Sequence, residues 1–340
     1  MNKLLRKGLI ELSYGTGLNL IKPQFLSLIV THRCNFRCPS CFNWQKNDYS
    51  EMSLPEWQKT AREIMEYFPT DTFVEINGGE PLLKADLVYE LADILSSKFL
   101  LTLNTNGSLI DDEIAANLKK HGISTVKLSF YSSDKEVNDL LRGQSGSWDS
   151  AMSAIQIINR HGLNLELAVL ITKNNIGQIP QLLEFAAGLP KTSVILQPLD
   201  EKIESPEAKD LSNNRFQQAL WPTADEVNNF FKYLENSNHK SQIKNSSSQL
   251  EAIKKYYFRQ NDSLKFRCFA GQRTVIINPD GNCLLCFKGG SIGNVAKGKI
   301  SDILSGLPAL EERAKLKKCR KSCRLLGCNY YRGFKEMIIK

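Results

Sequence analysis

The chain has 340 residues, of which 42% are hydrophobic and 24% charged. This composition indicates a globular protein of about two domains and argues against a disordered or fibrous chain. The net charge of +8 would suit an anionic substrate or a nucleic acid. No dense block of Lys and Arg interleaved with aromatic residues is present, however, which argues against a nucleic-acid partner. The chain lacks the apolar core of a signal peptide and a membrane span of about 18 apolar residues, so we expect a cytoplasmic protein.

The first 210 residues alternate between strand-like and helix-like segments. Gly122 and Gly162 directly follow two of the predicted helices, as C-terminal caps do. Strands that alternate with helices indicate βα units around a parallel sheet, either open or closed into a partial barrel. In both cases the ligand site lies beyond the carboxyl ends of the strands. Apolar, β-branched runs predict strands at 25–31, 72–76, 99–104, 125–130, 165–171 and 193–197, and amphipathic stretches predict helices at 54–67, 86–96, 110–121, 148–161 and 179–189.

The composition changes after about residue 200. Residues 200–214 are polar, and 236–249 are rich in Ser, Asn, Gln and Lys, which is typical of a loop or linker. Pro279-Asp280-Gly281 supplies turn residues between two strand-like runs and predicts a β-hairpin. The hairpin strands are 273–278 and 282–287, and the predicted helices of this half are 224–234, 250–259, 300–304 and 310–316. We divide the chain into an N-terminal extension (1–22), an α/β core (23–210), a helical or linker segment (211–265) and a C-terminal unit (266–340).

The nine cysteines fall into two groups, and none lies between Cys41 and Cys268. In a reducing compartment such clusters are more often metal ligands than disulfides. Cys34, Cys38 and Cys41 follow the first predicted strand. Three thiolates on one loop can bind three irons of a [4Fe–4S] cluster and leave the fourth iron open. The alternatives are buried thiols or a zinc site, for which His32 is the only histidine close by.

The segment THRCNFRCPSCF at residues 31–42 resembles the cluster loop of the radical S-adenosylmethionine (radical SAM) enzymes. Gly78-Gly79-Glu80-Pro81 is similar to the GGEP turn of this family, and Thr105-Asn106-Gly107 to its TNG turn. The resemblance implies a partial (β/α)6 TIM-like barrel. It also implies that the open iron is chelated by the amino and carboxylate groups of the cofactor's methionine part. One electron from the cluster then releases a 5′-deoxyadenosyl radical, which abstracts a hydrogen atom from the substrate.

The same resemblance implies which residues contact the cofactor. The candidates are Gly78, Gly79, Glu80, Asn106, Ser129 and Arg142. Two glycines let the backbone approach a ligand, Glu80 can accept a hydrogen bond from an ammonium group, and Arg142 can bind a carboxylate as a fork. Surface or capping roles remain alternatives for Ser129 and Arg142. Ser40 departs from the family, in which an aromatic residue often rests against adenine at this position, and Phe36 and Phe42 are candidate replacements.

The second cysteine group resembles the SPASM and twitch extensions of radical SAM enzymes. The resemblance rests on a hairpin between two cysteines, the Ile292-Gly293-Asn294-Val295 continuation and a closing cysteine group. Six cysteines are too few for two clusters with four thiolates each, so we expect one auxiliary [4Fe–4S] cluster in a small α+β domain. A zinc site is the alternative. The firmest expected ligands are Cys268, Cys286 and Cys319; Cys323 and Cys328 compete for the fourth place, and Cys283 is interpreted as a spare thiol.

These features predict a radical SAM enzyme that carries out oxidative modification, cross-linking or epimerisation of a peptide. We expect an external electron donor such as flavodoxin or ferredoxin. The same chemistry on a small metabolite (a sugar, an aminocyclitol or an amino acid) is the first alternative, because few residues precede the first strand and would leave no room for a leader-peptide recognition domain. A non-catalytic, zinc-bearing nucleic-acid-binding protein is the second alternative.

Overall fold

The computed structural model describes residues 3–18, 20–41, 43–45, 50–200, 219–258 and 268–319. The predicted ligands Cys323 and Cys328, and Phe42, lie outside the described residues. The strands are β1 (Phe25–Ile29), β2 (Phe73–Asn77), β3 (Leu101–Thr105), β4 (Ile123–Ser129), β5 (Asn164–Ile171), β6 (Thr192–Pro198), β7 (Thr274–Ile277), β8 (Asn282–Leu284) and β9 (Ser291–Asn294). The helices are α1 (Lys3–Thr16), α2 (Leu54–Tyr67), α3 (Ala85–Leu95), α4 (Asp112–Lys120), α5 (Lys135–Arg142), α6 (Ser147–Arg160), α7 (Ile179–Ala187), α9 (Ala224–Asn236), α10 (Ser247–Tyr257), α11 (Ala270–Arg273), α12 (Ile300–Ser305) and α13 (Leu307–Lys318).

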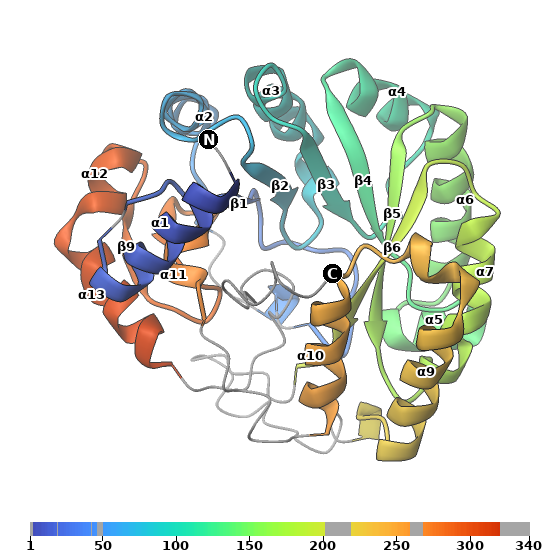
Figure 1. Ribbon diagram of the computed structural model, residues 1–340. Coiled ribbons are helices and arrows are strands. Elements are labelled where there is room, and N and C mark those ends of the chain that lie inside the picture. The colour runs from blue at the N-terminus through green and yellow to red at the C-terminus, as the bar shows by residue number, and fades with distance from the viewer. Residues whose placement is uncertain are drawn as a thin grey trace.

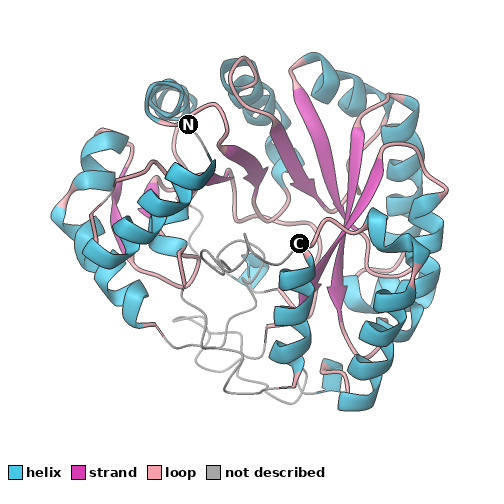
Figure 2. Ribbon diagram, viewed as in Figure 1, coloured by secondary structure: helices cyan, strands magenta, loops and turns pink. Residues whose placement is uncertain are grey.

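The nine strands form one curved sheet in the order β6-β5-β4-β3-β2-β1-β7-β8-β9 (Figure 1). β1 to β6 are parallel, and each pairs with the next strand in the chain. Parallel neighbours need a crossover connection, and here helices supply it. Figure 2 shows these helices outside the curved row of strands. The predicted partial (β/α)6 barrel is therefore confirmed.

Alternate residues of each strand face the helices and the barrel interior. Leu28 of β1 and Ile76 of β2 are fully buried in the main hydrophobic core, which also contains Trp57 of α2. The intervening Ser27 and Glu75 pair across β1 and β2 and face inward. Apolar packing on the outer face therefore leaves the inner face free to carry polar side chains.

Two helices of the barrel half were not predicted. α1 lies in the residues that were described only as an extension, and its Tyr14 ring packs 4.6 Å from that of Phe269. α5 begins after Asp134, whose side chain accepts a hydrogen bond from Val137 N, and it ends at Gly143 with φ +60°. Its eight residues are fewer than the roughly 11–18 over which helical periodicity is usually assessed.

The segment predicted as a loop or linker at 236–249 is largely ordered against the barrel. It contains the 3₁₀ helix η4 (Asn238–Gln242) and the start of α10. Ile243 forms a parallel bridge with Val194, and the Asn245 side chain binds both backbone groups of Leu196. The segment thus covers the open edge of β6, which would otherwise expose unpaired backbone groups.

The C-terminal hairpin is confirmed, and it is joined to the barrel sheet. β7 pairs with β1 in parallel, and β8 and β9 continue as antiparallel strands. This pairing carries the second cysteine group to the same sheet as the first. Among the helices of the described residues, none has both the length and the apolar composition needed to cross a membrane.

Candidate functional site

The cluster loop follows β1 and rests against the GGE turn, which we define as Gly78-Gly79-Glu80. Gly79 N donates to Thr31 O and Glu80 N to Arg33 O, each at 2.8 Å. A Cβ atom on Gly78 would lie 2.5 Å from Thr31 O, and one on Gly79 would lie against Arg33 O. The two glycines therefore permit a close approach between two protein backbones. The sequence suggested that the glycines allow the backbone to approach a ligand. In the structure they allow the GGE turn to approach the cluster loop.

The Arg142-Gly143 pair at the end of α5 holds the other side of the same loop. A Cβ on Gly143 would lie against Arg37 O and 3.1 Å from Pro39 Cδ. Arg142 is 6% exposed, and its guanidinium lies over the rings of Phe36 at 5.5 Å and Tyr131 at 4.9 Å. Its Nε atom is buried and has no hydrogen-bond partner among the described residues. An unpartnered charged donor beside three thiols suits an anionic ligand or cluster.

Phe36 is buried under the Arg142 guanidinium. The residue is only 4% exposed, so its ring presents little surface to adenine in this structure. Phe42 lies outside the described residues.

The Glu80 carboxylate is fully buried and links two strand ends. It accepts hydrogen bonds from Leu82 N at 3.0 Å, Thr105 Oγ1 at 2.8 Å and Asn106 N at 2.8 Å. Burial raises its pKa, against the effect of these three donors. A carboxylate has about four acceptor positions, and protein donors fill three of them here.

Asn106 and Ser129 lie at the carboxyl ends of β3 and β4, as predicted. The Asn106 side chain donates to Asn35 Oδ1 at 2.8 Å and accepts from Ser108 N and Oγ. It also approaches Cys34 Sγ at 4.0 Å. Asn106 therefore positions the cluster loop in this structure, while Ser129 ends β4 in a half-buried place.

The three thiols of the first group are mutually close. Burial raises the pKa values of Cys34 and Cys38, and the neighbouring thiols raise them further. Such thiols are held as thiolates by a cation, which is what an iron cluster supplies. The backbone N–H of Phe36 donates to Cys34 Sγ at 3.4 Å, a bond that stabilises a cluster thiolate.

The second cysteine group divides into two kinds of thiol. Cys283 is fully buried in the hydrophobic core, and burial raises its pKa to about 12. Cys286 carries a hydrogen bond from Lys288 N at 3.4 Å, as Cys34 does from Phe36, and it interacts electrostatically with Cys319. Cys268 and Cys319 are partly exposed. Among the expected ligands, the described contacts therefore bring Cys286 and Cys319 near each other.

An ionic network on the inner face of the barrel, with three of its four side chains buried, was missed in the sequence. Lys127 Nζ lies 2.6 Å from Glu75 Oε2 and 3.2 Å from Glu166 Oε1, and Lys244 Nζ lies 2.7 Å from Glu166 Oε2. We call these four residues the floor network, because Glu75 and Lys127 sit two residues before the ends of β2 and β4. The signal available in the sequence was that each of three apolar strands carries one charged residue at an inward position.

Glu51 is a second residue that sequence reasoning missed. It accepts from Thr31 Oγ1 at 2.5 Å and pairs with Lys84 at 2.7 Å. It thereby joins the start of the cluster loop to the 3₁₀ helix η2 (Pro81–Lys84), which follows the GGE turn.

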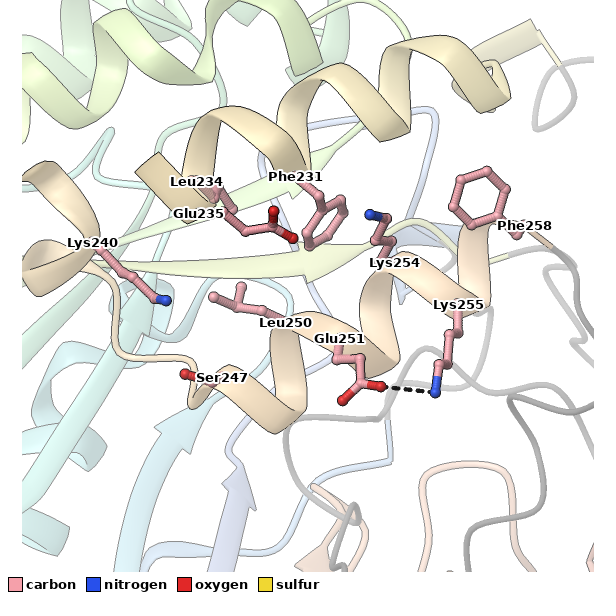
Figure 3. A pocket seen from close by; sticks show the side chains of 10 residues that line it. All are labelled: Phe231, Leu234, Glu235, Lys240, Ser247, Leu250, Glu251, Lys254, Lys255 and Phe258. Atoms are coloured by element: carbon pink, nitrogen blue, oxygen red, sulfur yellow. Dashed lines mark ion pairs between the residues drawn. The ribbon is translucent and has the colours of Figure 1, made fainter. Parts of the chain in front are cut away.

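A separate hollow of about 560 Å³ lies between α9, η4 and α10 (Figure 3). Phe231, Leu250 and Phe258 line it, and Glu251 and Lys255 form a 2.8 Å ion pair at its edge. None of the predicted site residues lines this hollow, so the candidate site is the strand-end cluster described above.

Comparison with known proteins agrees with this geometry. Residues 28–186 match the family model of the radical SAM superfamily, and residues 268–329 match that of an iron–sulfur cluster-binding domain, SPASM. The chain belongs to the radical SAM superfamily. It is an enzyme whose family binds a [4Fe–4S] cluster and S-adenosylmethionine, and its SPASM domain implies auxiliary iron–sulfur binding.

Individual relatives support the same family. The chain is 24% identical to the PqqA peptide cyclase of Granulibacter bethesdensis over 306 residues, which cover 85% of this chain and 76% of the relative. SuiB of Streptococcus suis bound to S-adenosylmethionine matches with a TM-score of 0.66 and 18% identity, covering 85% of this chain and 67% of that one. anSMEcpe with bound AdoMet matches with a TM-score of 0.65 and 16% identity, covering 90% and 88%. These structures establish the shared fold.

Proposed function

We propose that this radical SAM enzyme cleaves S-adenosylmethionine reductively and abstracts a hydrogen atom from a peptide, which it then modifies oxidatively. The observation that carries the peptide is the resemblance to a peptide cyclase over 85% of this chain. SuiB has also been solved bound to the precursor peptide SuiA, and anSMEcpe with a bound Cp18Cys peptide. Cross-linking and epimerisation are the other outcomes of the same first step.

Cys34, Cys38 and Cys41 would hold the [4Fe–4S] cluster, which supplies the electron that cleaves the cofactor. The buried Arg142 guanidinium, with Nε unpartnered, would bind the cofactor's carboxylate. Gly78, Gly79, Glu80, Asn106 and Ser129 remain the proposed surroundings of the cofactor. The contacts described above suggest different roles for them: the two glycines and Asn106 hold the cluster loop, and the buried Glu80 carboxylate joins the GGE turn to the end of β3.

Cys268, Cys286 and Cys319, with Cys323 or Cys328, would hold the auxiliary cluster. It would accept the electron that an oxidative modification releases. We propose flavodoxin or ferredoxin as the external donor, and the cytoplasm, where thiols stay reduced, as the compartment.

The cofactor half of the proposal is tested by replacing Cys34, Cys38 and Cys41 with alanine. Anaerobically reconstituted wild-type protein should bind about eight irons, and the triple variant about four. The variant should form no 5′-deoxyadenosine. Cys283→Ala is the matched control and should keep all the iron, because Cys283 is fully buried and is not among the expected cluster ligands. Continued formation of 5′-deoxyadenosine by the triple variant would rule out the proposed chemistry.

The peptide half is tested by mass spectrometry of a short peptide encoded beside the gene. Oxidative modification should lower its mass by two hydrogen atoms, and only in the presence of S-adenosylmethionine. A peptide that stays unchanged, while a small metabolite stimulates 5′-deoxyadenosine formation, would transfer the chemistry to that metabolite.

A further inference from the structure

Asn77 is the last residue of β2 and directly precedes the GGE turn. Its side chain faces the barrel interior, because the preceding Ile76 is fully buried toward the helices. Asn77 lies one inward position above Glu75 of the floor network and keeps 8% exposure. It therefore stands at the carboxyl end of the strands, where ligands of this fold bind.

The hydrogen bonds of Asn77 determine the orientation of its amide group. Nδ2 donates to Ser27 Oγ at 2.8 Å and to Glu75 Oε1 at 3.3 Å. An ionised carboxylate can only accept, so a turned amide would place two oxygens against each other. Lys127 Nζ lies 2.6 Å from the other oxygen of Glu75, Oε2, so the lysine occupies that side of the carboxylate and Oε1 faces the Asn77 amide. The amide nitrogen must therefore face the floor network, and the carbonyl oxygen Oδ1 must face away from it.

Lys127 remains charged beside Glu75. Burial opposes its charge, but the carboxylates of Glu75 and Glu166 hold its pKa above the ordinary value. Lys127 therefore stays charged, and the floor network orients the Asn77 amide through this ion pair.

Oδ1 of Asn77 is an open acceptor. It accepts no hydrogen bond from the described residues. It is also not one of their fully buried polar atoms that lack a partner, so part of its surface is accessible from the interior of the barrel. The neighbouring acceptor differs in this respect, because the Glu80 carboxylate is fully buried and already accepts three bonds. The opposite side of the glycine turn is closed by the backbone of the cluster loop.

We propose that Asn77 Oδ1 accepts a hydrogen bond from an N–H or O–H group of S-adenosylmethionine, and that the floor network positions it to do so. The inference rests on the proposed function, from which it takes the ligand. That ligand offers an ammonium group on its methionine part and hydroxyl and amino donors on its adenosine part. Methionine and 5′-deoxyadenosine carry these donors separately and can be used to distinguish them.

The test is anaerobic equilibrium dialysis of the iron-loaded protein with S-adenosylmethionine, methionine and 5′-deoxyadenosine. Asn77→Leu keeps the side-chain volume and removes the acceptor. We expect S-adenosylmethionine to bind about ten- to a hundredfold more weakly if the donor is the ammonium, and about three- to tenfold more weakly if it is a neutral group. Methionine should lose affinity in the first case and 5′-deoxyadenosine in the second.

Two further measurements separate this role from a general loss of structure. The change that S-adenosylmethionine causes in the electron paramagnetic resonance signal of the cluster should require a concentration raised by the same factor. Asn164→Leu makes the same exchange at the opposite, amino-terminal end of β5, where Asn164 is exposed, and should leave binding unchanged.

Unchanged binding of all three ligands by Asn77→Leu would overturn the inference. If that variant takes up less iron than wild type, Glu75→Gln decides, because it keeps Asn77 but allows the amide to turn. We then expect about three- to tenfold weaker S-adenosylmethionine binding, and unchanged binding overturns the inference. Wild-type protein that holds its iron but binds no S-adenosylmethionine would instead refute the proposed function.

Discussion

Replacing Gly79 with alanine tests whether the GGE turn serves the cluster loop. The new Cβ would lie against Arg33 O and 2.6 Å from His32 O. Both are backbone atoms, so no side-chain rotation can relieve the overlap, and the turn and the loop must separate. Separation would break the bonds from Gly79 N to Thr31 O and from Glu80 N to Arg33 O.

The expected loss of stability can be estimated from these contacts. Overpacking costs about 1–3 kcal/mol, and each lost backbone hydrogen bond about 0.5–1.5 kcal/mol. Together these effects predict about 2–6 kcal/mol, concentrated at the cluster loop. The iron bound by the first cysteine group should fall with it, while the iron of the C-terminal group should remain.

The assay compares anaerobic chemical denaturation and bound iron in Gly79→Ala and Gly177→Ala. A Cβ at Gly177 meets nothing within 4 Å, so this control should keep its stability and its iron. Gly79→Ala that matches Gly177→Ala in both measurements would refute the interpretation of the turn as a backbone contact. Loss of stability with full iron retention would place the strain outside the cluster loop.

The remaining two predictions concern buried charges. Lys127→Met should destabilise the protein by about 3–5 kcal/mol, because Glu75 and Glu166 lose a buried partner. Adding Glu75→Gln to this variant should restore part of the lost stability, as measured by chemical denaturation. If the double variant is no more stable than Lys127→Met, the ion pairing is contradicted. The second prediction concerns Glu51. Burial alone would raise the pKa of Glu51, but the hydrogen bonds from Lys84 and Thr31 hold it below its ordinary value. The stability that the ionised Glu51 contributes is therefore complete above its unfolded-state pKa of about 4.3. It is lost as the pH falls through the lower pKa that Glu51 has in the folded protein. Glu51→Gln should reduce the loss of unfolding free energy between about pH 6 and 3, and an unchanged slope would argue against this contact.

The alternating pattern of the first 210 residues was sufficient to predict the barrel, because each βα unit is local in the chain. Gly122 and Gly162 illustrate this: both were predicted as helix ends, and both have the positive φ of such caps, +93° and +68°. The pairing of β7 with β1 joins residues far apart in the chain, and no local pattern carries that information. The C-terminal hairpin was therefore predicted correctly, but its place in the barrel sheet was not.

The candidate site shows a similar division. Cysteine spacing was enough to predict the cluster loop, because Cys34, Cys38 and Cys41 lie on one short segment of the chain. The floor network could not be found in this way, because Glu75, Lys127 and Glu166 come from three strands and become partners only through the register of the sheet. Asn77 was not selected as a candidate for the same reason. The orientation of its amide depends on Ser27 and Glu75, which contact it in the folded sheet, and not on its neighbours in the sequence.

The cluster loop is held by contacts that do not involve iron. The GGE turn binds the backbone of Thr31 and Arg33, and Gly143 lies against Arg37 O on the other side. Because these contacts come from β2 and α5, two rigid elements of the barrel, folding itself brings the three thiols close together. The entropy of ordering the loop is then spent in folding and not in binding the cluster, which favours uptake of iron by a preformed site. Two glycine motifs that lie far apart in the sequence therefore act on one loop, and this shared partner explains why both accompany the cysteines in this chain.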